Sequence, residues 1–255
     1  MIRNSKIPLA IDLFCGLGGW TEGLLAEGWN VIGFDIERHD YGTSCYPSQL
    51  CLHDVLDLHG SQFRNADLIV ASPPCQAYSY RAMPWKRAKA LPPPTNELFD
   101  ACFRIQREAC EAAGRHIPLV VENVRGAQPW VGDAKWHYGS FYLWGDVPAL
   151  MPNIKMKAKW IMDDYKGKRR TVEGLYENGK AIKGTGGSWY GDYQTQKQAQ
   201  DEAIKQGGDW FNKSCTGSMS RRFSSRSKAR KAASAQIAKI PLALSRHIGA
   251  VYFPA

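Results

Sequence analysis

The chain has 255 residues, of which 44% are hydrophobic and 22% charged, so it can bury an ordinary core spread over one or two domains. This composition excludes a mainly disordered or fibrous protein, and no apolar run approaches the ~18 residues that a membrane helix needs. The first residues do not read as an export signal, and the seven cysteines are odd in number and contain no CxxC pair. We therefore expect a protein of a reducing cytoplasm, without a disulfide framework and without a metal site.

The net charge of +9 is unevenly distributed. Residues 1–145 hold 13 Lys and Arg against 15 Asp and Glu, giving −2, whereas residues 146–255 hold 20 against 9, giving +11. A solvated surface would explain a basic second part. The alternative is a contact surface for a polyanion, because each cation set against a phosphate releases condensed counterions.

In chain order, residues 8–14 predict a buried strand, residues 15–19 a glycine-rich turn, and residues 20–27 a helix that ends at Gly28. A second strand is expected over 30–34, with Asp35 at its carboxyl end, and a third over 67–71. Helical spacing follows over 96–113, and another apolar strand over 118–121 ends at Glu122. Strands that alternate with helices indicate a parallel, doubly wound α/β sheet.

Three further segments set the domain organisation. Residues 76–97 contain four prolines and several cations, which predicts a long irregular loop of the kind that is usually functional. Apolar periodicity weakens from 146 to 224, where aromatic residues lie among lysines, and this shift indicates a second domain. A basic helix is expected over 227–235 and an apolar one over 242–252. The predicted domains are thus 1–145, 146–224, and a segment 225–255 that returns to the first.

The glycine-rich turn and two aspartates point to a nucleotide-like cofactor. Glycines let backbone amides approach a ligand, and the helix N-terminus adds positive potential, although ordinary turn glycines would look the same. Asp35 ends the second strand, where an acidic residue can accept both ribose hydroxyls. Asp54 is a further acidic candidate for the same edge of the sheet, unless it merely caps a loop or helix.

Cys75 differs from the other six cysteines, which we expect to be inert and buried. It follows two prolines at a predicted strand end, where ligands collect in open α/β sheets. Glu122 ends a later strand at the same edge. A thiol nucleophile and a carboxyl acid that face one pocket form a covalent-catalysis pair.

Three motifs in this order resemble those of the DNA (cytosine-5) methyltransferase family in its compact bacterial or phage form: DLFCGLGG (12–19), SPPCQAYS (72–79) and ENV (122–124). Weaker matches are Asp35 and Asp54, LF at 98–99 with RI at 104–105, and SRSKAR at 225–230 with residues 240–250. The resemblance covers nearly the whole chain apart from 146–224. It implies a Rossmann-like, S-adenosylmethionine-dependent methyltransferase sheet with helices on both faces, plus a small basic target-recognition domain.

The resemblance also implies roles for individual residues. The Cys75 thiolate would add to C6 of cytosine, and Glu122 would protonate N3, while Pro74 and Gln76 place the nucleophile and Ser79 stiffens its loop. The implied catalytic set is Cys75, Glu122, Pro74, Gln76, Ser79 and Asn123. The implied residues for S-adenosylmethionine are Asp12, Phe14, Gly16, Leu17, Gly18, Gly19, Asp35, Ile36, Asp54, Val55, Pro74, Leu98 and Lys239. The implied DNA contacts are Gln76, Arg81, Trp85, Lys86, Arg87, Trp189, Tyr190, Arg221 and Arg222.

Two departures from the family pattern stand out. An Arg-x-Arg segment is missing, because residues 135–143 contain no arginine, and Lys135 or His137 would have to replace it. The last motif opens with Ala238 and Lys239 in place of Gly-Asn. If this lysine lies near the positively charged sulfonium of the donor, as the resemblance implies, repulsion between the two like charges would cost about 1–4 kcal/mol.

Three explanations of Lys239 are open: it turns outward to a phosphate, the alignment slips by one residue, or the donor carries an anion. In the last case the donor would be carboxy-S-adenosylmethionine, and the product 5-carboxymethylcytosine.

The expected partner is double-stranded DNA with the target cytosine flipped out of the stack. We expect a monomer in the cytoplasm of a bacterial host, encoded by the bacterium or by a phage, with no membrane contact. Two alternatives are an RNA cytosine-5 methyltransferase and a catalytically silent DNA-binding homologue. Methylation of an amino group is disfavoured, because that chemistry needs no thiol. Partnership with a restriction enzyme and solitary action are equally compatible with the sequence.

Overall fold

The structure is a computed structural model that describes residues 7–40, 45–79, 90, 92–151, 231, 235 and 238–254, and the backbone of 161–163, 169–171, 176–177 and 180–181. The chain divides into two compact units, residues 1–154 with 239–255, and residues 155–238. In the second unit, β8 (Ile161–Asp163) pairs antiparallel with β9 (Arg169–Thr171), and β10 (Tyr176–Glu177) with β11 (Lys180–Ala181). No helix in the described ranges is long and apolar enough to cross a bilayer.

A mixed seven-stranded sheet forms the centre of the first unit, in the order β3-β2-β1-β4-β5-β7-β6. Five strands are parallel: β1 (Leu9–Leu13), β2 (Asn30–Asp35), β3 (Gln49–Leu52), β4 (Leu68–Ala71) and β5 (Leu119–Asn123). β7 (Phe141–Gly145) runs antiparallel to both β5 and β6 (Trp136–Tyr138). The strands predicted at 8–14, 30–34, 67–71 and 118–121 are confirmed. The expected parallel sheet is confirmed for β1 to β5, and the β6–β7 hairpin adds an antiparallel edge that the sequence did not predict.

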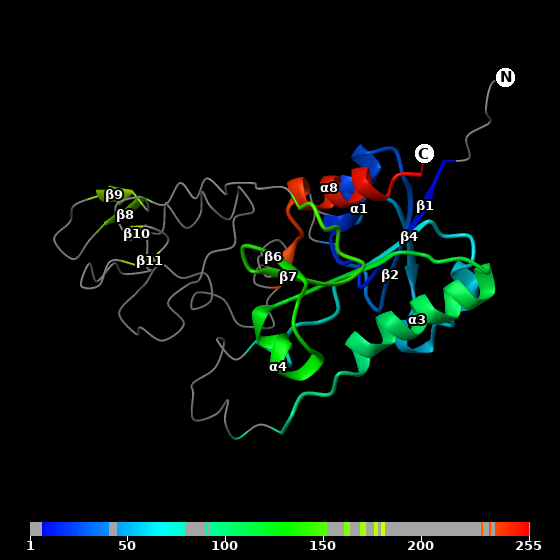
Figure 1. Ribbon diagram of the computed structural model, residues 1–255, viewed down its shortest axis with the longest axis horizontal. Coiled ribbons are helices and arrows are strands. Elements are labelled where there is room, and N and C mark those ends of the chain that lie inside the picture. Colours follow the sequence, from blue (N-terminus) through cyan, green and yellow to red (C-terminus); the bar gives the residue numbers. More distant parts are fainter. Residues whose placement is uncertain are drawn as a thin grey trace. The chain divides into compact units, whose positions relative to one another are not determined.

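Helices cover both faces of this sheet (Figure 1). On one face lie α3 (Glu97–Ala113) and the short 3₁₀ turns η1 (Val55–Asp57) and η2 (Gly60–Phe63); on the other lie α1 (Gly19–Ala26) and α8 (Leu242–Tyr252). Side chains alternate along each strand, so Ile11 and Val121 pack toward α3 while Ala10 and Val120 pack toward α1 and α8. Burial on both faces explains why these strands read as continuous apolar runs.

The C-terminal helix predicted over 242–252 is confirmed as α8, and it packs against α1 (Figure 1). Gly23 makes the close approach possible, because a Cβ there would lie 2.5 Å from the backbone nitrogen of Arg246. Trp29 Nε1 also donates a 3.0 Å hydrogen bond to the carbonyl of Gly249. Two short helical segments, η4 (Arg125–Ala127) and α4 (Gln128–Val131), follow β5.

Candidate functional site

The carboxyl ends of the five parallel strands meet at one edge of the sheet, which is where ligands bind in open α/β folds. The residues predicted from the sequence gather there. The glycine-rich turn follows β1, Asp35 ends β2, Asp54 follows β3, residues 72–79 follow β4, and Glu122 and Asn123 end β5. The structure therefore brings these residues to one edge, and their individual roles stay predictions.

The turn after β1 has an unusual backbone. Phe14 has a φ of 57° and is the only non-glycine with a positive φ among the described residues, a strained conformation of a kind that clusters at functional sites. Gly16 (φ 51°) and Gly18 (φ 76°) follow it, and Gly18 is the N-cap of α1. A Cβ on Gly16 would meet nothing within 4 Å, so the backbone there borders open space.

Asp35 holds this turn in place. Its Oδ2 accepts a 2.9 Å hydrogen bond from the Gly16 N–H, and its Oδ1 accepts one from Glu37 N–H at 3.2 Å. Burial alone would raise the pKa of Asp35, but hydrogen bonds from His39, Gly16 and Glu37 outweigh it and lower the pKa below the ordinary value. The neighbouring Ile36 is 71% exposed at the same edge. Asp35 thus supplies a stable anion, with an apolar side chain beside it.

Asp12 is the buried counterpart of Asp35. Its Oδ2 accepts a 2.6 Å hydrogen bond from Thr21 Oγ1, which is itself 2.6 Å from the Tyr46 hydroxyl, whereas its Oδ1 has no hydrogen-bond partner among the described residues. Burial raises the pKa of Asp12 to about 7; the Thr21 bond opposes this and the charge of Asp35 adds to it. The sequence does not point to Thr21 and Tyr46, because Thr21 lies on α1 and Tyr46 between β2 and β3, and only the tertiary fold brings both near Asp12.

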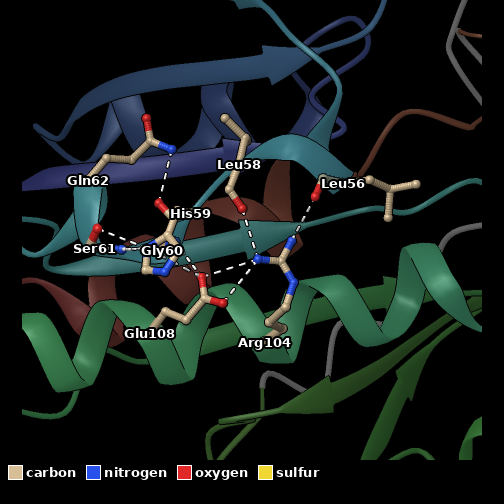
Figure 2. A network of polar contacts seen from close by, with 8 residues as sticks. All are labelled: Leu56, Leu58, His59, Gly60, Ser61, Gln62, Arg104 and Glu108. Carbon is tan, nitrogen blue, oxygen red and sulfur yellow. Dashed lines mark hydrogen bonds and ion pairs between the residues drawn. The ribbon is translucent and has the colours of Figure 1, made fainter.

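Asp54 caps η1, since its Oδ1 accepts a 2.9 Å hydrogen bond from Leu56 N–H. Figure 2 shows how this segment is fastened to α3: Arg104 donates to the carbonyls of Leu58 (2.9 Å) and Leu56 (3.1 Å), and Glu108 accepts from Gly60 N–H at 2.6 Å. Arg104, in the motif at 104–105, therefore has a structural role, because it holds the segment after β3 against α3. Leu98 lies half-buried in the first turn of α3, and Val55 is buried in the core.

The loop after β4 carries the candidate nucleophile. Cys75 is half-buried between two exposed residues, Pro74 and Gln76, and its carbonyl accepts a 3.0 Å hydrogen bond from Tyr78 N–H that closes a turn. Tyr78 is buried, and its hydroxyl donates to Asn96 Oδ1 at 3.0 Å. Ser79, the last described residue of this loop, is half-buried. A buried tyrosine thus anchors the turn that presents the thiol.

Asn123 joins this loop to the end of β5. Its Nδ2 donates a 3.0 Å hydrogen bond to the Pro73 carbonyl, and its Oδ1 accepts one from Val124 N–H at 2.8 Å. Ala71 is in register with Val121, so Ser72 lies level with Glu122, which is 8% exposed. The loop that bears the thiol and the strand that bears the carboxyl group are thereby fixed to each other.

The two candidates to replace the missing Arg-x-Arg segment, Lys135 and His137, lie just before and within the β6–β7 hairpin. Asn123, Tyr142 and His137 are direct cross-strand neighbours and share one face of the sheet, whereas Glu122 points to the opposite face. His137 stacks on Tyr142, with ring centroids 4.9 Å apart. The geometry does not favour His137 as a replacement beside Glu122. Lys135 is exposed, and its backbone N–H donates to the carbonyl of Leu143 at 2.9 Å.

Lys239 lies at the glycine-rich turn, with its Cγ 3.0 Å from the position of a Cβ built on Gly19, and its ammonium pairs with Glu22. No group of three His, Cys, Asp or Glu side chains that could hold a metal occurs among the described residues. Several predicted site residues lie outside the described part of the chain: Arg81, Trp85, Lys86, Arg87, Trp189, Tyr190, Arg221, Arg222 and the motif at 225–230.

The first unit is thus a mixed α/β fold whose seven-stranded sheet gathers the candidate residues at one edge. Residues 9–128 match the family of C-5 cytosine-specific DNA methylases.

One curated relative is the type II methyltransferase M.AplI of Arthrospira platensis, which is 29% identical over 124 residues, covering 46% of this chain and 32% of that protein. Among solved structures, a candidate DNA modification methyltransferase encoded within an E. coli prophage is 25% identical, with a TM-score of 0.34 over 49% of this chain and 35% of that one. The Dnmt2 methyltransferase of S. pombe is 16% identical, with a TM-score of 0.34 over 48% and 36%. The chain thus spans about a third of the length of each.

Proposed function

We propose that this chain is a DNA cytosine-5 methyltransferase, which transfers a methyl group from S-adenosylmethionine to C5 of a cytosine flipped out of duplex DNA. The observation that carries the proposal is the hydrogen bond from Asn123 to the Pro73 carbonyl, because it joins the loop that bears Cys75 to the strand that bears Glu122. The match of residues 9–128 to the C-5 cytosine-specific DNA methylase family supports the same reading.

The residues at the strand ends fit S-adenosylmethionine on two observations. Asp12 Oδ1 is a buried acceptor without a partner in the part of the chain that the structure describes, and Gly16 borders open space that a side chain would fill. The turn at 14–19 and Asp35 would hold the cofactor, with Asp54 and Val55 at its adenine end. When bound, the cofactor supplies an electrophilic methyl group.

In the proposed mechanism Cys75 acts on the substrate base. Its thiolate forms a bond to C6 of cytosine, and the displaced π electrons make C5 nucleophilic while Glu122 donates a proton to N3. After C5 has gained the methyl group, it loses its proton to a base. The C6–S bond then breaks, the C5=C6 bond re-forms, the thiolate leaves, and N3 returns its proton to Glu122. Glu122 is 8% exposed, so little water competes for its proton.

The base must leave the duplex before any of this can occur, at a cost of a few kcal/mol. We propose that the basic second part of the chain offsets this cost through phosphate contacts, since residues 146–255 carry a net charge of +11 from 20 Lys and Arg and 9 Asp and Glu. Residues 146–224 would read the neighbouring bases, and the loop at 76–97 would close over the flipped cytosine. The protein would act as a monomer.

The pairing of Lys239 with Glu22 favours the methyl donor over carboxy-S-adenosylmethionine. Lys239 was the reason to consider an anionic donor, because a free ammonium next to a sulfonium needs a compensating charge. Glu22 supplies that charge from within the chain. Mass spectrometry of nucleosides, with both donors supplied, should therefore detect 5-methylcytosine and no 5-carboxymethylcytosine.

The test of the proposed function is transfer of a labelled methyl group to duplex DNA and, in parallel, to tRNA. Cys75→Ser should abolish turnover while cofactor and DNA binding persist, and Cys45→Ser, at an exposed cysteine, is the matched control. The wild-type protein should also form a stable adduct with DNA that contains 5-fluorocytosine. Full activity of Cys75→Ser would refute the covalent mechanism, and labelling of tRNA alone would refute the DNA substrate.

A further inference from the structure

The segment that follows residue 238 packs directly on the first turn of α1. Gly19 begins this helix, and a Cβ built there would lie 3.0 Å from Cγ of Lys239 and 3.0 Å from Cβ of Ile240. Any side chain at position 19 would push the two segments apart. Lys239 is therefore fixed beside the glycine-rich turn and the N-terminus of α1.

This contact places a cation where the helix already has positive potential. The ammonium of Lys239 pairs with Glu22, which stands in the first turn of the same helix, and their side chains are 19% and 39% exposed. One carboxylate thus faces two sources of positive potential, the helix N-terminus and the ammonium. Partial burial makes the pair less screened than a surface ion pair.

We propose that Glu22 is a positioning residue that holds the Lys239 ammonium on α1, so that the neighbouring turn can accept a donor with a positively charged sulfonium. This inference rests on the proposed function. S-adenosylmethionine is a sulfonium cation, whereas its product S-adenosylhomocysteine is a neutral thioether, and the rest of the two molecules is the same. A freed ammonium would repel the first and leave the second almost unaffected. The ratio of the two dissociation constants therefore reports on this pair.

The experiment measures the dissociation constants of S-adenosylmethionine and S-adenosylhomocysteine for the full chain by titration calorimetry. Glu22→Gln should weaken binding of S-adenosylmethionine by roughly three- to tenfold more than binding of S-adenosylhomocysteine. Glu22→Gln combined with Lys239→Gln should return the ratio to the wild-type value. Glu27→Gln is the matched control, because it breaks the 2.6 Å pair with Arg246 at the other end of α1. It should leave the ratio unchanged.

Each outcome decides the question. An equal loss of affinity for both ligands in Glu22→Gln would show a merely structural role and overturn the inference. A shifted ratio that persists in the double variant would also overturn it, because Glu22 would then attract the donor directly. A wild-type protein that binds neither ligand would refute the proposed function itself, and the inference with it.

Discussion

Asn123→Ala should uncouple the loop after β4 from the end of β5. The wild-type side chain is 1% exposed and makes two hydrogen bonds, to the Pro73 carbonyl and from Val124 N–H. Alanine leaves both backbone groups without these partners, and each unsatisfied buried group costs about 1–3 kcal/mol. Because the Val124 N–H is only partly buried and water can reach it, the expected loss in the free energy of unfolding is about 2–4 kcal/mol.

The assay is thermal unfolding followed by circular dichroism, combined with single-turnover methyl transfer. A loss of this size should lower Tm by roughly 4–16 °C in a protein of this length. The rate of methyl transfer should fall as well, because Pro73 and Cys75 lose their fixed position, while the affinity for S-adenosylmethionine should change little. The control, Asn65→Ala at an exposed position, should stay within about 0.5 kcal/mol of wild type. A Tm of Asn123→Ala within about 2 °C of wild type would refute the reasoning.

Three further predictions concern the cofactor edge, the helix contact and the basic part. Burial raises the pKa of Asp12 from 3.8 to about 7, so the contribution of its neutral carboxyl group to native-state stability is present at low pH and is lost as the pH rises through this window. Relative to wild type, Asp12→Asn should therefore gain up to about 4 kcal/mol of stability between pH 4 and 8 in denaturant titrations. A difference that stays constant with pH would contradict the burial argument. Gly23→Ala should destabilise by about 1–3 kcal/mol in the same titrations, because its Cβ would overlap Ser245, whereas Gly249→Ala, with its nearest neighbour at 3.3 Å, should cost less; equal losses would refute the close packing. The logarithm of DNA affinity should fall steeply and linearly with the logarithm of the salt concentration, because phosphate contacts by the basic residues 146–255, with a net charge of +11, release counterions. An affinity that does not change with salt would exclude such contacts.

The sequence by itself determined the elements that bury apolar side chains on both faces. The strands at 9–13, 68–71 and 119–123 and the helices at 97–113 and 242–252 follow from unbroken apolar runs or from helical spacing, which a local pattern records directly. The candidate residues at the strand ends were also visible, because parallel strands place their carboxyl ends at one edge. The β6–β7 hairpin was not visible. Its strands are short and partly exposed, and only pairing with β5 makes them part of the sheet.

What the tertiary structure alone decided is which partners the candidate residues have. Asp12 accepts a hydrogen bond from Thr21, whose hydroxyl also contacts Tyr46, and Asn123 bonds to the Pro73 carbonyl 50 residues away. These contacts exist only once the segments that carry them have packed together. From the sequence, the lysine at position 239 was a reason to consider a donor whose transferred group carries a carboxylate. In the fold, its ammonium pairs with Glu22, which lies 217 residues earlier in the chain. A sequence pattern records which side chains a segment buries, but the contacts between distant segments depend on how the whole sheet and its helices close around one another.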